Sequence, residues 1–562
     1  MLCALLGTIY VQVNVDQLQD RAWFNTTMDL AIGAMLILLI LRATWQAFGI
    51  FIPVIAIIAV VYPFVGHYLP EPFHSTSLSF EKTIANLSIC MSRGIYGTPL
   101  SISATYIFLW MVFGSVLQAT GGVEFFLQVG RMVSRKFRSG PAIMSVFTSA
   151  LIGMITGSTS ANIVLDGTFT IPLMKKAGFS PEQAGAIEAA ASNGGQIMPP
   201  VMGAAAFTMA GMTGIPYLNI ALMAIIPAVL YFYCCGLYVV LVAEREKVTP
   251  VMEKIDIKEL FLSAPLFIIP LAVILVLLIL GFTVMFVGFW AIVILIALSF
   301  VRRKTRPSLK TLMTGLVQGA ITGGQIAVML ACAGLIVTSF TMTGLGVKMS
   351  SGIEVWSGGN LFVALMIISS ICIIMGMMGI TVSAYIIVAM VAGPALMKMG
   401  LNLAQAHFFI MFVSVFAFVT PPVAMGSLVA AKLAGADYIK TAIESCKATG
   451  AAFILPLLLI YCPIIILQPQ DLLSASMGIV ATLIFLTAFE IGLVGYAWRK
   501  CGLTERILWG LSATISILHL VLQSYMLFAI AIIVFCLLVF YQRKQILRER
   551  WQNKDALTYR LE

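Results

Sequence analysis

Two polar runs interrupt an apolar region of the chain and carry the residue types best suited to hold an ion. One is Gly157-Ser158-Thr159-Ser160-Ala161-Asn162, and the other is Ser192-Asn193-Gly194-Gly195-Gln196, which leads into Met198-Pro199-Pro200. Proline lacks a backbone N–H and disfavours a helical residue before it, so this last run should break a helix into two halves. The freed carbonyls, with nearby hydroxyl and amide oxygens, suit a small cation such as Na⁺. The half-helix N-termini suit an anion such as a carboxylate.

The same pattern recurs later in the chain. Ser160-Ala161 is repeated as Ser383-Ala384, and Pro199-Pro200 is repeated at an almost identical offset as Pro421-Pro422. A duplicated apolar unit that is broken by Gly and Pro at matching places indicates a transporter's binding site. The second copy is poorer in oxygen atoms, because its hydroxyls are only those of Thr381, Ser383 and Thr420. Backbone carbonyls must therefore contribute more there.

A simpler reading is that Ser, Thr and Gly only let membrane helices approach closely. The repetition and the paired prolines favour binding sites over packing alone. Two acids lie beside the first pair of runs, Asp166 and Glu188, and the second copy has Ala389 and Ile410 in their places. Because buried charge is costly in a membrane, we expect both acids at the cytoplasmic interface, with a proton or cation role as the alternative. Glu490 is expected to pair locally or to face the interface.

The elements that position these runs must cross a membrane. The chain of 562 residues is 60% hydrophobic and 10% charged, with mean hydropathy +1.03, whereas soluble proteins are about 25% charged. The net charge of +10 is attributed to basic loops rather than to nucleic-acid binding. The ten cysteines include no CxxC pair, so we expect them to pack rather than to form disulfides or metal sites. At about 20 apolar residues per span, the predicted spans are 28–43, 48–67, 101–118, 182–211, 215–241, 261–281, 284–300, 312–343, 404–435, 449–467, 473–497 and a pair within 507–541.

Basic residues orient these spans, since cytoplasmic loops are enriched in Lys and Arg. The loops 242–260 and 301–311 are basic and are assigned to the cytoplasm. The segment 141–174 has strongly basic flanks, which include Lys175, whereas 360–397 is flanked only by Lys348 and Lys398. Each segment is broken near its centre, so we predict two re-entrant helical hairpins that enter from opposite faces. The predicted fold is an all-α polytopic membrane protein built of inverted repeats with broken helices.

Several of these motifs resemble the fused membrane subunit of tripartite ATP-independent periplasmic (TRAP) transporters. The resemblance covers roughly residues 20–467 and is carried by Ser139-Gly140-Pro141, the run 157–162, Thr170-Ile171-Pro172-Leu173-Met174-Lys175, the run 194–207, Ala406-His407 and Thr420-Pro421-Pro422-Val423-Ala424. It implies an elevator-type ion-transporter fold and Na⁺-coupled uptake of an organic acid delivered by a periplasmic receptor, with the receptor of the TAXI type. It also implies no cofactor beyond Na⁺ as the coupling ion.

In that family, two Na⁺ sites lie where the hairpin tips meet the broken helices. The resemblance places the first Na⁺ site at Ser158, Thr159, Ser160, Asn162, Ser192 and Gly194, and the second at Gly379, Thr381, Ser383 and Thr420. It places the substrate at Asn162, Asn193, Gly195, Pro199, Pro200, Thr420, Pro421 and Pro422. The run Gly379-Ile380-Thr381-Val382-Ser383 departs from the family, which has Pro and more Thr there.

The predicted organisation has five parts. They are a small N-terminal scaffold domain at 1–98, shorter than in the fused family, the first repeat at 99–241, connecting spans at 242–311, the second repeat at 312–467, and extra spans with a basic cytoplasmic tail at 468–562. We expect the multi-pass protein in a bacterial inner membrane with its C-terminus in the cytoplasm. A receptor-independent Na⁺/dicarboxylate symporter is the alternative. A hydrolase is disfavoured because the sequence has no HExxH motif, and a channel is disfavoured by the paired hairpins.

Overall fold

The protein is almost entirely helical. The computed structural model describes residues 2–20, 24–135, 137–249, 256–303, 305–379, 381–468 and 470–558, and no β-strand forms among them. Eleven helices in these ranges are long and apolar enough to cross a membrane. The prediction of an all-α polytopic membrane protein is confirmed at this level. The apolar stretch within 507–541 forms two helices, α25 (Leu503–Leu522) and α26 (Tyr525–Thr558), as predicted.

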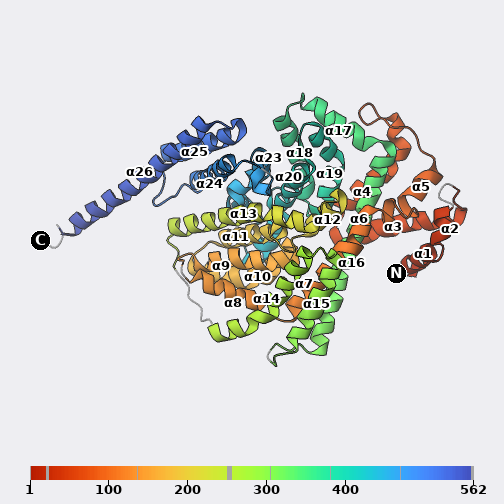
Figure 1. The fold of residues 1–562 in the computed structure, drawn as a ribbon, viewed down its shortest axis with the longest axis horizontal. Coiled ribbons are helices and arrows are strands. Elements are labelled where there is room, and N and C mark those ends of the chain that lie inside the picture. The colour runs from red at the N-terminus through yellow and green to blue at the C-terminus, as the bar shows by residue number, and fades with distance from the viewer. Residues whose placement is uncertain are drawn as a thin grey trace.

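A group of N-terminal helices lies at one end of the molecule, at the right in Figure 1. A capping box between Thr26 and Asp29 starts the longest of them, α3. The group has its own small core, in which Leu36 and Leu87 are buried. The long helix α16 (Leu309–Thr343) packs against α3 and α4 and so joins this group to the rest of the fold. The group comprises α1 (Leu2–Val13), α2 (Val15–Asp20), α3 (Thr27–Phe48), α4 (Phe51–Val65) and α5 (Phe80–Ser88).

The next segment forms a series of helices that includes the first hairpin. The helix α8 packs on α9 with Gly130 against Thr148, and it also contacts α14 (Ile257–Ile279), where Phe125 stacks on Phe267. A capping box of Ser180 and Gln183 starts α11. The series is α6 (Thr98–Ile102), a π-helical stretch (Ser103–Ile107), α7 (Phe108–Ala119), α8 (Gly122–Ser134), α9 (Gly140–Thr156), α10 (Thr159–Ala177), α11 (Pro181–Gly194), the 3₁₀ turn η4 (Gly195–Ile197), α12 (Ala204–Thr213) and α13 (Tyr217–Arg245).

The later segment repeats this series element by element. A capping box of Asn402 and Gln405 starts α20, at the position that corresponds to the capping box of α11. The series is α16 (Leu309–Thr343), α17 (Leu345–Trp356), α18 (Leu361–Gly376), α19 (Thr381–Lys398), α20 (Leu403–Phe416), the 3₁₀ turn η5 (Ala417–Val419), α21 (Met425–Ala434) and α22 (Tyr438–Thr449). The internal repeat read from the sequence is therefore also a repeat of structure.

Both breaks predicted at the paired prolines are confirmed. The stretch 182–211 divides into α11 and α12, and the stretch 404–435 divides into α20 and α21. The second half of each broken helix crosses to the other repeat: α12 packs on α19 and α20, and α21 packs on α10 and α11. The two repeats are thereby interlocked, with their hairpins and helix breaks at the centre of the molecule.

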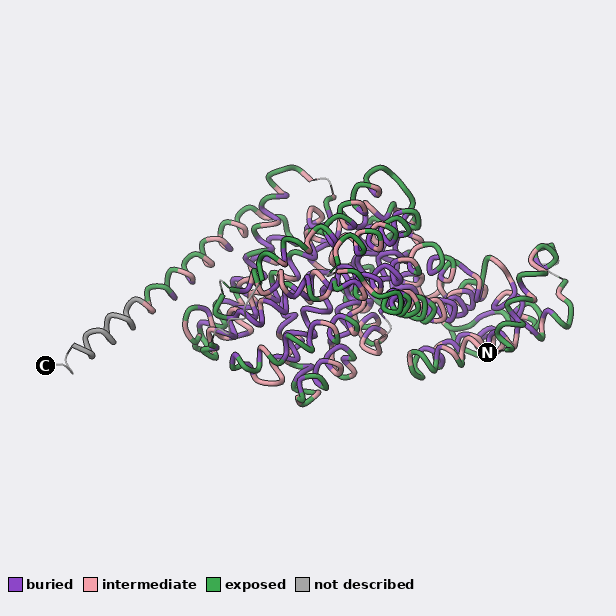
Figure 2. The backbone as a smooth tube through the Cα atoms, turned by 90° about the horizontal axis from the view of Figure 1, so that it is seen from below, coloured by how far each residue is buried: buried purple, intermediate pink, exposed green. Residues whose placement is uncertain are grey.

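The remaining helices lie outside this centre. The pair α14 (Ile257–Ile279) and α15 (Val284–Ser299) connects the repeats, and η6 (Gly450–Ile454), α23 (Leu455–Tyr461), η7 (Pro463–Ile466) and α24 (Leu472–Val494) follow the second repeat. In Figure 1, α26 projects away from the body at the left. Large apolar side chains such as Phe261 and Leu537 are exposed on these outer helices, while the central helices are mostly buried (Figure 2). Lipid contact accounts for such exposed apolar surface in a membrane protein.

Candidate functional site

The tip of the first hairpin lies directly against the first helix break. The backbones of Gly153, near the end of α9, and Gly195, in η4, approach so closely that a Cβ on Gly195 would lie 2.5 Å from the Cα of Gly153. Gly157 turns the chain between α9 and α10 with φ of 59°, a left-handed value that favours glycine. A Cβ there would meet the carbonyl oxygen of Met202 at 2.6 Å. Small residues at three points therefore let the tip dock against the break.

The second hairpin docks in the same way. A Cβ on Gly376, at the end of α18, would lie 2.6 Å from both the Ser414 carbonyl oxygen and the Ala417 Cβ. Gly379 takes the place of Gly157 in the turn, with φ of 86°. The adjoining Ile380, which belongs to the predicted polar run, lies outside the described residues. The close packing favoured by the simpler reading thus occurs, and it positions polar side chains at both tips.

The two helix breaks have matching backbone geometry. Both Pro199-Pro200 and Pro421-Pro422 are cis, and Met202 and Ala424, at corresponding positions of the two repeats, both have positive φ. The helices that follow α12 and α21, which are α13 and α22, each begin with a tyrosine that donates a hydrogen bond back to the loop at the break. Tyr217 reaches the carbonyls of Pro200 (2.8 Å) and Val201, and Tyr438 reaches those of Pro422 (2.6 Å) and Val423. This pair of tyrosines was not among the residues predicted from the sequence, although both lie at nearly the same short distance after the prolines.

Most residues of the predicted first Na⁺ site are brought together. Asn162 is fully buried, and its Nδ2 donates to the carbonyls of Ser149 on α9 (2.9 Å) and Ser192 on α11 (3.5 Å). Its Oδ1 has no hydrogen-bond partner among the described residues. The Thr159 hydroxyl donates to Asn193 Oδ1 (3.2 Å). Ser158 caps α10 and is half-buried, as is Ser160, while Gly194 packs against the Tyr231 ring.

Among the residues of the predicted second Na⁺ site, no side-chain hydrogen bond joins one member to another in the part of the chain that the structure describes. Thr381 is buried in the first turn of α19. Ser383 is fully buried, and its Oγ has no hydrogen-bond partner among the residues that the structure describes. The Thr420 hydroxyl donates to the Phe416 carbonyl (3.1 Å) within its own helix end. These hydroxyls keep oxygen lone pairs available, which fits a small cation that takes oxygen ligands.

The predicted substrate residues differ in their exposure. Asn193 and Gly195 are buried, Thr420, Pro199, Pro200 and Pro421 are half-buried, and Pro422 is exposed. The paired prolines therefore border the site rather than fill it.

Gln196 joins the two hairpin tips and was not among the site residues predicted from the sequence. Its Nε2 donates to Thr159 Oγ1 (2.6 Å) in the first hairpin. Its Oε1 accepts a hydrogen bond from Thr381 Oγ1 (3.3 Å) in the second. The two predicted sites are thus connected through one side chain. Its place inside the run 194–200 was visible in the sequence, but nothing there indicated that the second hairpin lies within its reach.

The expectation that Asp166 and Glu188 lie at the interface is wrong. Both are fully buried between α9, α10 and α11. The Ser149 hydroxyl lies within hydrogen-bonding distance of both carboxyl groups, at 2.9 Å from Asp166 and 3.4 Å from Glu188. The other hydroxyls that donate to the pair are Thr148 on Asp166 (2.6 Å), and Ser145 (2.8 Å), Thr170 (2.5 Å) and Ser192 (2.9 Å) on Glu188. Hydroxyl donors at successive turns of α9 provide polar surroundings that compensate for the loss of water.

Glu490 pairs locally, which was one of its two expected placements. It is fully buried, and its Oε2 accepts a hydrogen bond from the Ala451 backbone N–H (3.1 Å). It lies on α24, apart from both hairpin tips.

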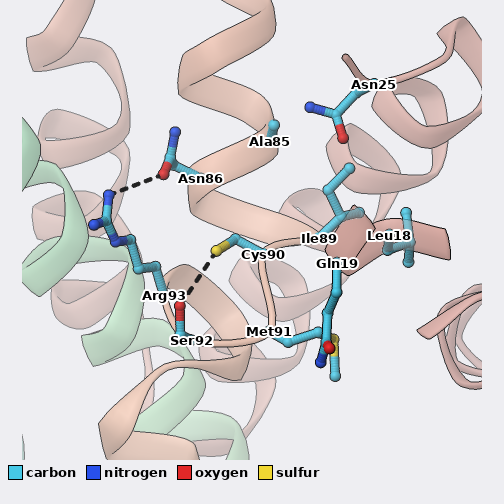
Figure 3. A pocket seen from close by; sticks show the side chains of 10 residues that line it. All are labelled: Leu18, Gln19, Asn25, Ala85, Asn86, Ile89, Cys90, Met91, Ser92 and Arg93. Atoms are coloured by element: carbon cyan, nitrogen blue, oxygen red, sulfur yellow. Dashed lines mark hydrogen bonds between the residues drawn. The ribbon is translucent and has the colours of Figure 1, made fainter. Parts of the chain in front are cut away.

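A separate cavity of about 420 Å³ lies among the N-terminal helices (Figure 3). Arg93 donates to Asn86 there (3.3 Å), and Cys90 lies 3.6 Å from Ser92. The lining residues are Leu18, Gln19, Asn25, Ala85, Asn86, Ile89, Cys90, Met91, Ser92 and Arg93. None of the predicted site residues borders it, so it is distinct from the central site.

Comparison with known families gives one match that covers most of the chain. A family model described as "Tripartite ATP-independent periplasmic transporter, DctM component" matches residues 32–465. The match includes both hairpins, both broken helices and all the residues of the central site. No individual curated protein matches the chain.

Proposed function

Because the chain belongs to the tripartite ATP-independent periplasmic transporter family, as its DctM component, we propose that it is the permease subunit of a Na⁺-coupled secondary transporter that imports an organic acid. The family is one of membrane transporters that work with a periplasmic substrate-binding partner. The observation that carries the proposal is the docking of a hairpin tip against a broken helix, which occurs twice and places buried oxygen atoms at the centre of the fold.

The first Na⁺ is held in this proposal by Ser158, Thr159, Ser160, Asn162, Ser192 and Gly194. Asn162 is best suited to it, since its Nδ2 is fixed by two backbone carbonyls and its Oδ1 is left free among the described residues. The second Na⁺ is held by Gly379, Thr381, Ser383 and Thr420, where the buried Ser383 Oγ is the corresponding free oxygen among the residues described. Oxygen ligands from side chains and from unwound backbone are typical of Na⁺ sites in transporters.

The acid binds between these two sites in the proposal. Its carboxylate contacts Asn162, Asn193, Gly195 and Thr420 together with the backbone of the paired prolines at 199–200 and 421–422. The N-termini of α12 and α21 follow these prolines and favour negative charge. Cation and anion sites placed side by side give coupling, because each bound charge offsets the cost of desolvating the other.

Transport proceeds in this proposal by elevator-type alternating access of inverted repeats with two re-entrant hairpins. The N-terminal helices form the scaffold that corresponds to a fused small subunit, and the partner is a receptor of the TAXI type. The membrane is the bacterial inner membrane, with the C-terminus in the cytoplasm. The interlocked repeats support this view, because α12 and α21 tie the two hairpins into one body.

Uptake by purified protein in proteoliposomes tests this function. A panel of labelled carboxylates is supplied with and without an inward Na⁺ gradient, each with and without TAXI-type receptors. We expect uptake that requires both Na⁺ and a receptor. Na⁺-driven uptake without any receptor would instead favour a stand-alone Na⁺/dicarboxylate symporter. Uptake that is indifferent to the Na⁺ gradient would contradict the proposed coupling.

Inverted topology predicts that the flanks of the two hairpins lie on opposite sides of the membrane. Single cysteines are placed at 350–358, before the second hairpin, and at 137–139, before the first, in a background without the native cysteines. An impermeant thiol reagent applied from the periplasmic side should label the first set and spare the second. Equal labelling of both sets would contradict the inversion, and permeabilised cells provide the control that both sets can react.

A further inference from the structure

Gln196 occupies a position that no ion site requires. It lies in η4, where α11 ends, and only 8% of its surface is exposed. Its Nε2 lies 2.6 Å from Thr159 Oγ1 and its Oε1 lies 3.3 Å from Thr381 Oγ1. One side chain from the first helix break therefore holds the tips of both hairpins together.

The Gln196 amide accepts a hydrogen bond at one end and donates at the other, where its Nε2 also lies 3.4 Å from Asn193 Oδ1. Thr381 donates to Gln196, Gln196 donates to Thr159, and Thr159 donates to Asn193 Oδ1 (3.2 Å). The amide oxygen accepts from Thr381 as a carboxylate oxygen would. An amide and a carboxylate share a planar shape with two polar atoms on one carbon, but a carboxylate has no N–H to donate. A carboxylate fits between the same two hydroxyls once the Thr159 hydroxyl turns its proton from Asn193 Oδ1 to the ligand.

The bridge that Gln196 forms between Thr159 and Thr381 has no counterpart in the second repeat. The position equivalent to Gln196 there is Phe418, whose ring packs against Gly379 and Gly426. Features that serve one Na⁺ per repeat should occur twice. A bridge that occurs once and touches both tips suits the one ligand that both tips would share, the substrate.

We propose that the Gln196 side chain is a placeholder for the substrate carboxylate. In the substrate-free protein it satisfies the hydroxyls of Thr159 and Thr381 and keeps the tips joined. An entering carboxylate takes hydrogen bonds from those two hydroxyls, and the Gln196 amide is displaced. The inference rests on the proposed function and adds to it a residue that competes with the substrate.

Because Gln196 competes with the substrate in this proposal, its removal is expected to strengthen carboxylate binding rather than weaken it. Gln196→Leu removes the hydrogen bonds of the amide to Thr159, Thr381 and Asn193 at similar volume, and it frees the two hydroxyls for the ligand. Since a pre-existing competitor lowers apparent affinity, carboxylate binding should become tighter, by about five- to tenfold for two hydrogen bonds. A residue that contacted the substrate, or one that only stabilised the fold, would give weaker binding when removed.

The binding measurement uses the purified full chain in lipid nanodiscs at constant Na⁺, with acetate, succinate and 2-oxoglutarate as probes. Gln183→Leu is the matched control, because Gln183 is also hydrogen-bonded but caps the far end of α11. We expect a lower Kd for Gln196→Leu and an unchanged Kd for Gln183→Leu. Weaker or unchanged binding by Gln196→Leu would overturn the placeholder role.

Hydrogen exchange tests, without any substrate, whether Gln196 links the two hairpin tips. Loss of the Gln196 amide should speed amide exchange at the start of α19, in the other repeat, while Gln183→Leu should leave it unchanged. Unaltered exchange in α19 would overturn the inference even if uptake confirmed the proposed function. Faster exchange in a protein that binds none of the probes would still show that Gln196 links the two hairpin tips. It would overturn the placeholder role for carboxylates together with the proposed substrate class.

Discussion

Gly195→Ala is expected to abolish Na⁺-dependent uptake, because the added methyl group would separate the first hairpin from the helix break. The new Cβ would lie 2.5 Å from the Cα of Gly153, and backbone cannot move aside as the end of a flexible side chain can. Overpacking of this kind costs about 1–3 kcal/mol, and relief of the clash displaces the tip that carries Thr159 and Asn162. Uptake in proteoliposomes and thermal unfolding of the purified variant measure the two effects.

Two further variants make this result specific. Gly376→Ala should have the same effect at the second hairpin, where the new Cβ would lie 2.6 Å from the Ser414 carbonyl oxygen. Gly236→Ala is the matched control, since no heavy atom among the described residues lies within 4 Å of a Cβ at that position of α13. Normal uptake by Gly195→Ala would show that the tip need not dock so closely.

Asn162→Ala should raise the Na⁺ concentration needed for half-maximal uptake by at least about tenfold. The side chain is fully buried, and its Oδ1 is free of hydrogen bonds among the described residues. Loss of one ion ligand that costs about 1.4 kcal/mol changes an affinity tenfold. The Na⁺ dependence of initial uptake rates, at saturating carboxylate, measures the effect directly.

A control is needed because Asn162 also holds α10 to its neighbours. Asn402→Ala removes another asparagine, the N-cap of α20, and should lower stability without changing the Na⁺ dependence. An unchanged half-maximal Na⁺ concentration in Asn162→Ala would remove this residue from the first site. A fall in maximal rate alone would indicate that its contacts to Ser149 and Ser192 matter only for packing.

Local patterns in the sequence predicted the parts of the fold that depend on local chemistry. Two consecutive prolines remove two backbone donors and disfavour helix before them, so both breaks were placed correctly at Pro199-Pro200 and Pro421-Pro422. Single prolines such as Pro227 lie inside continuous helices. Apolar length predicted the long helices, including the pair α25 and α26. The matching spacing of motifs in the two copies predicted that the same elements would occur twice.

Contacts between distant segments could not be read in this way. Gln196 and Thr381 are 185 residues apart, and their hydrogen bond depends on how α12 and α21 cross between repeats. The acids Asp166 and Glu188 were misplaced for a related reason. Their cost of burial was judged from apolar neighbours in sequence, whereas the hydroxyls of Ser145, Thr148 and Ser149 reach them from another helix.

The tyrosines that tie down the two proline loops have a consequence for how the halves of such a molecule diverge. Tyr217 and Tyr438 hold equivalent backbone carbonyls in place, so both loops keep the same hydrogen bonds although the side chains around them differ between the repeats. Substitutions can then accumulate at the side chains around each loop while the backbone of the loop is kept. One half carries two carboxyl groups and a glutamine, while the other has Ala389, Ile410 and Phe418 in their places. Because the backbone is duplicated, one repeat can acquire specialised polar side chains while the other repeat keeps the same fold without them.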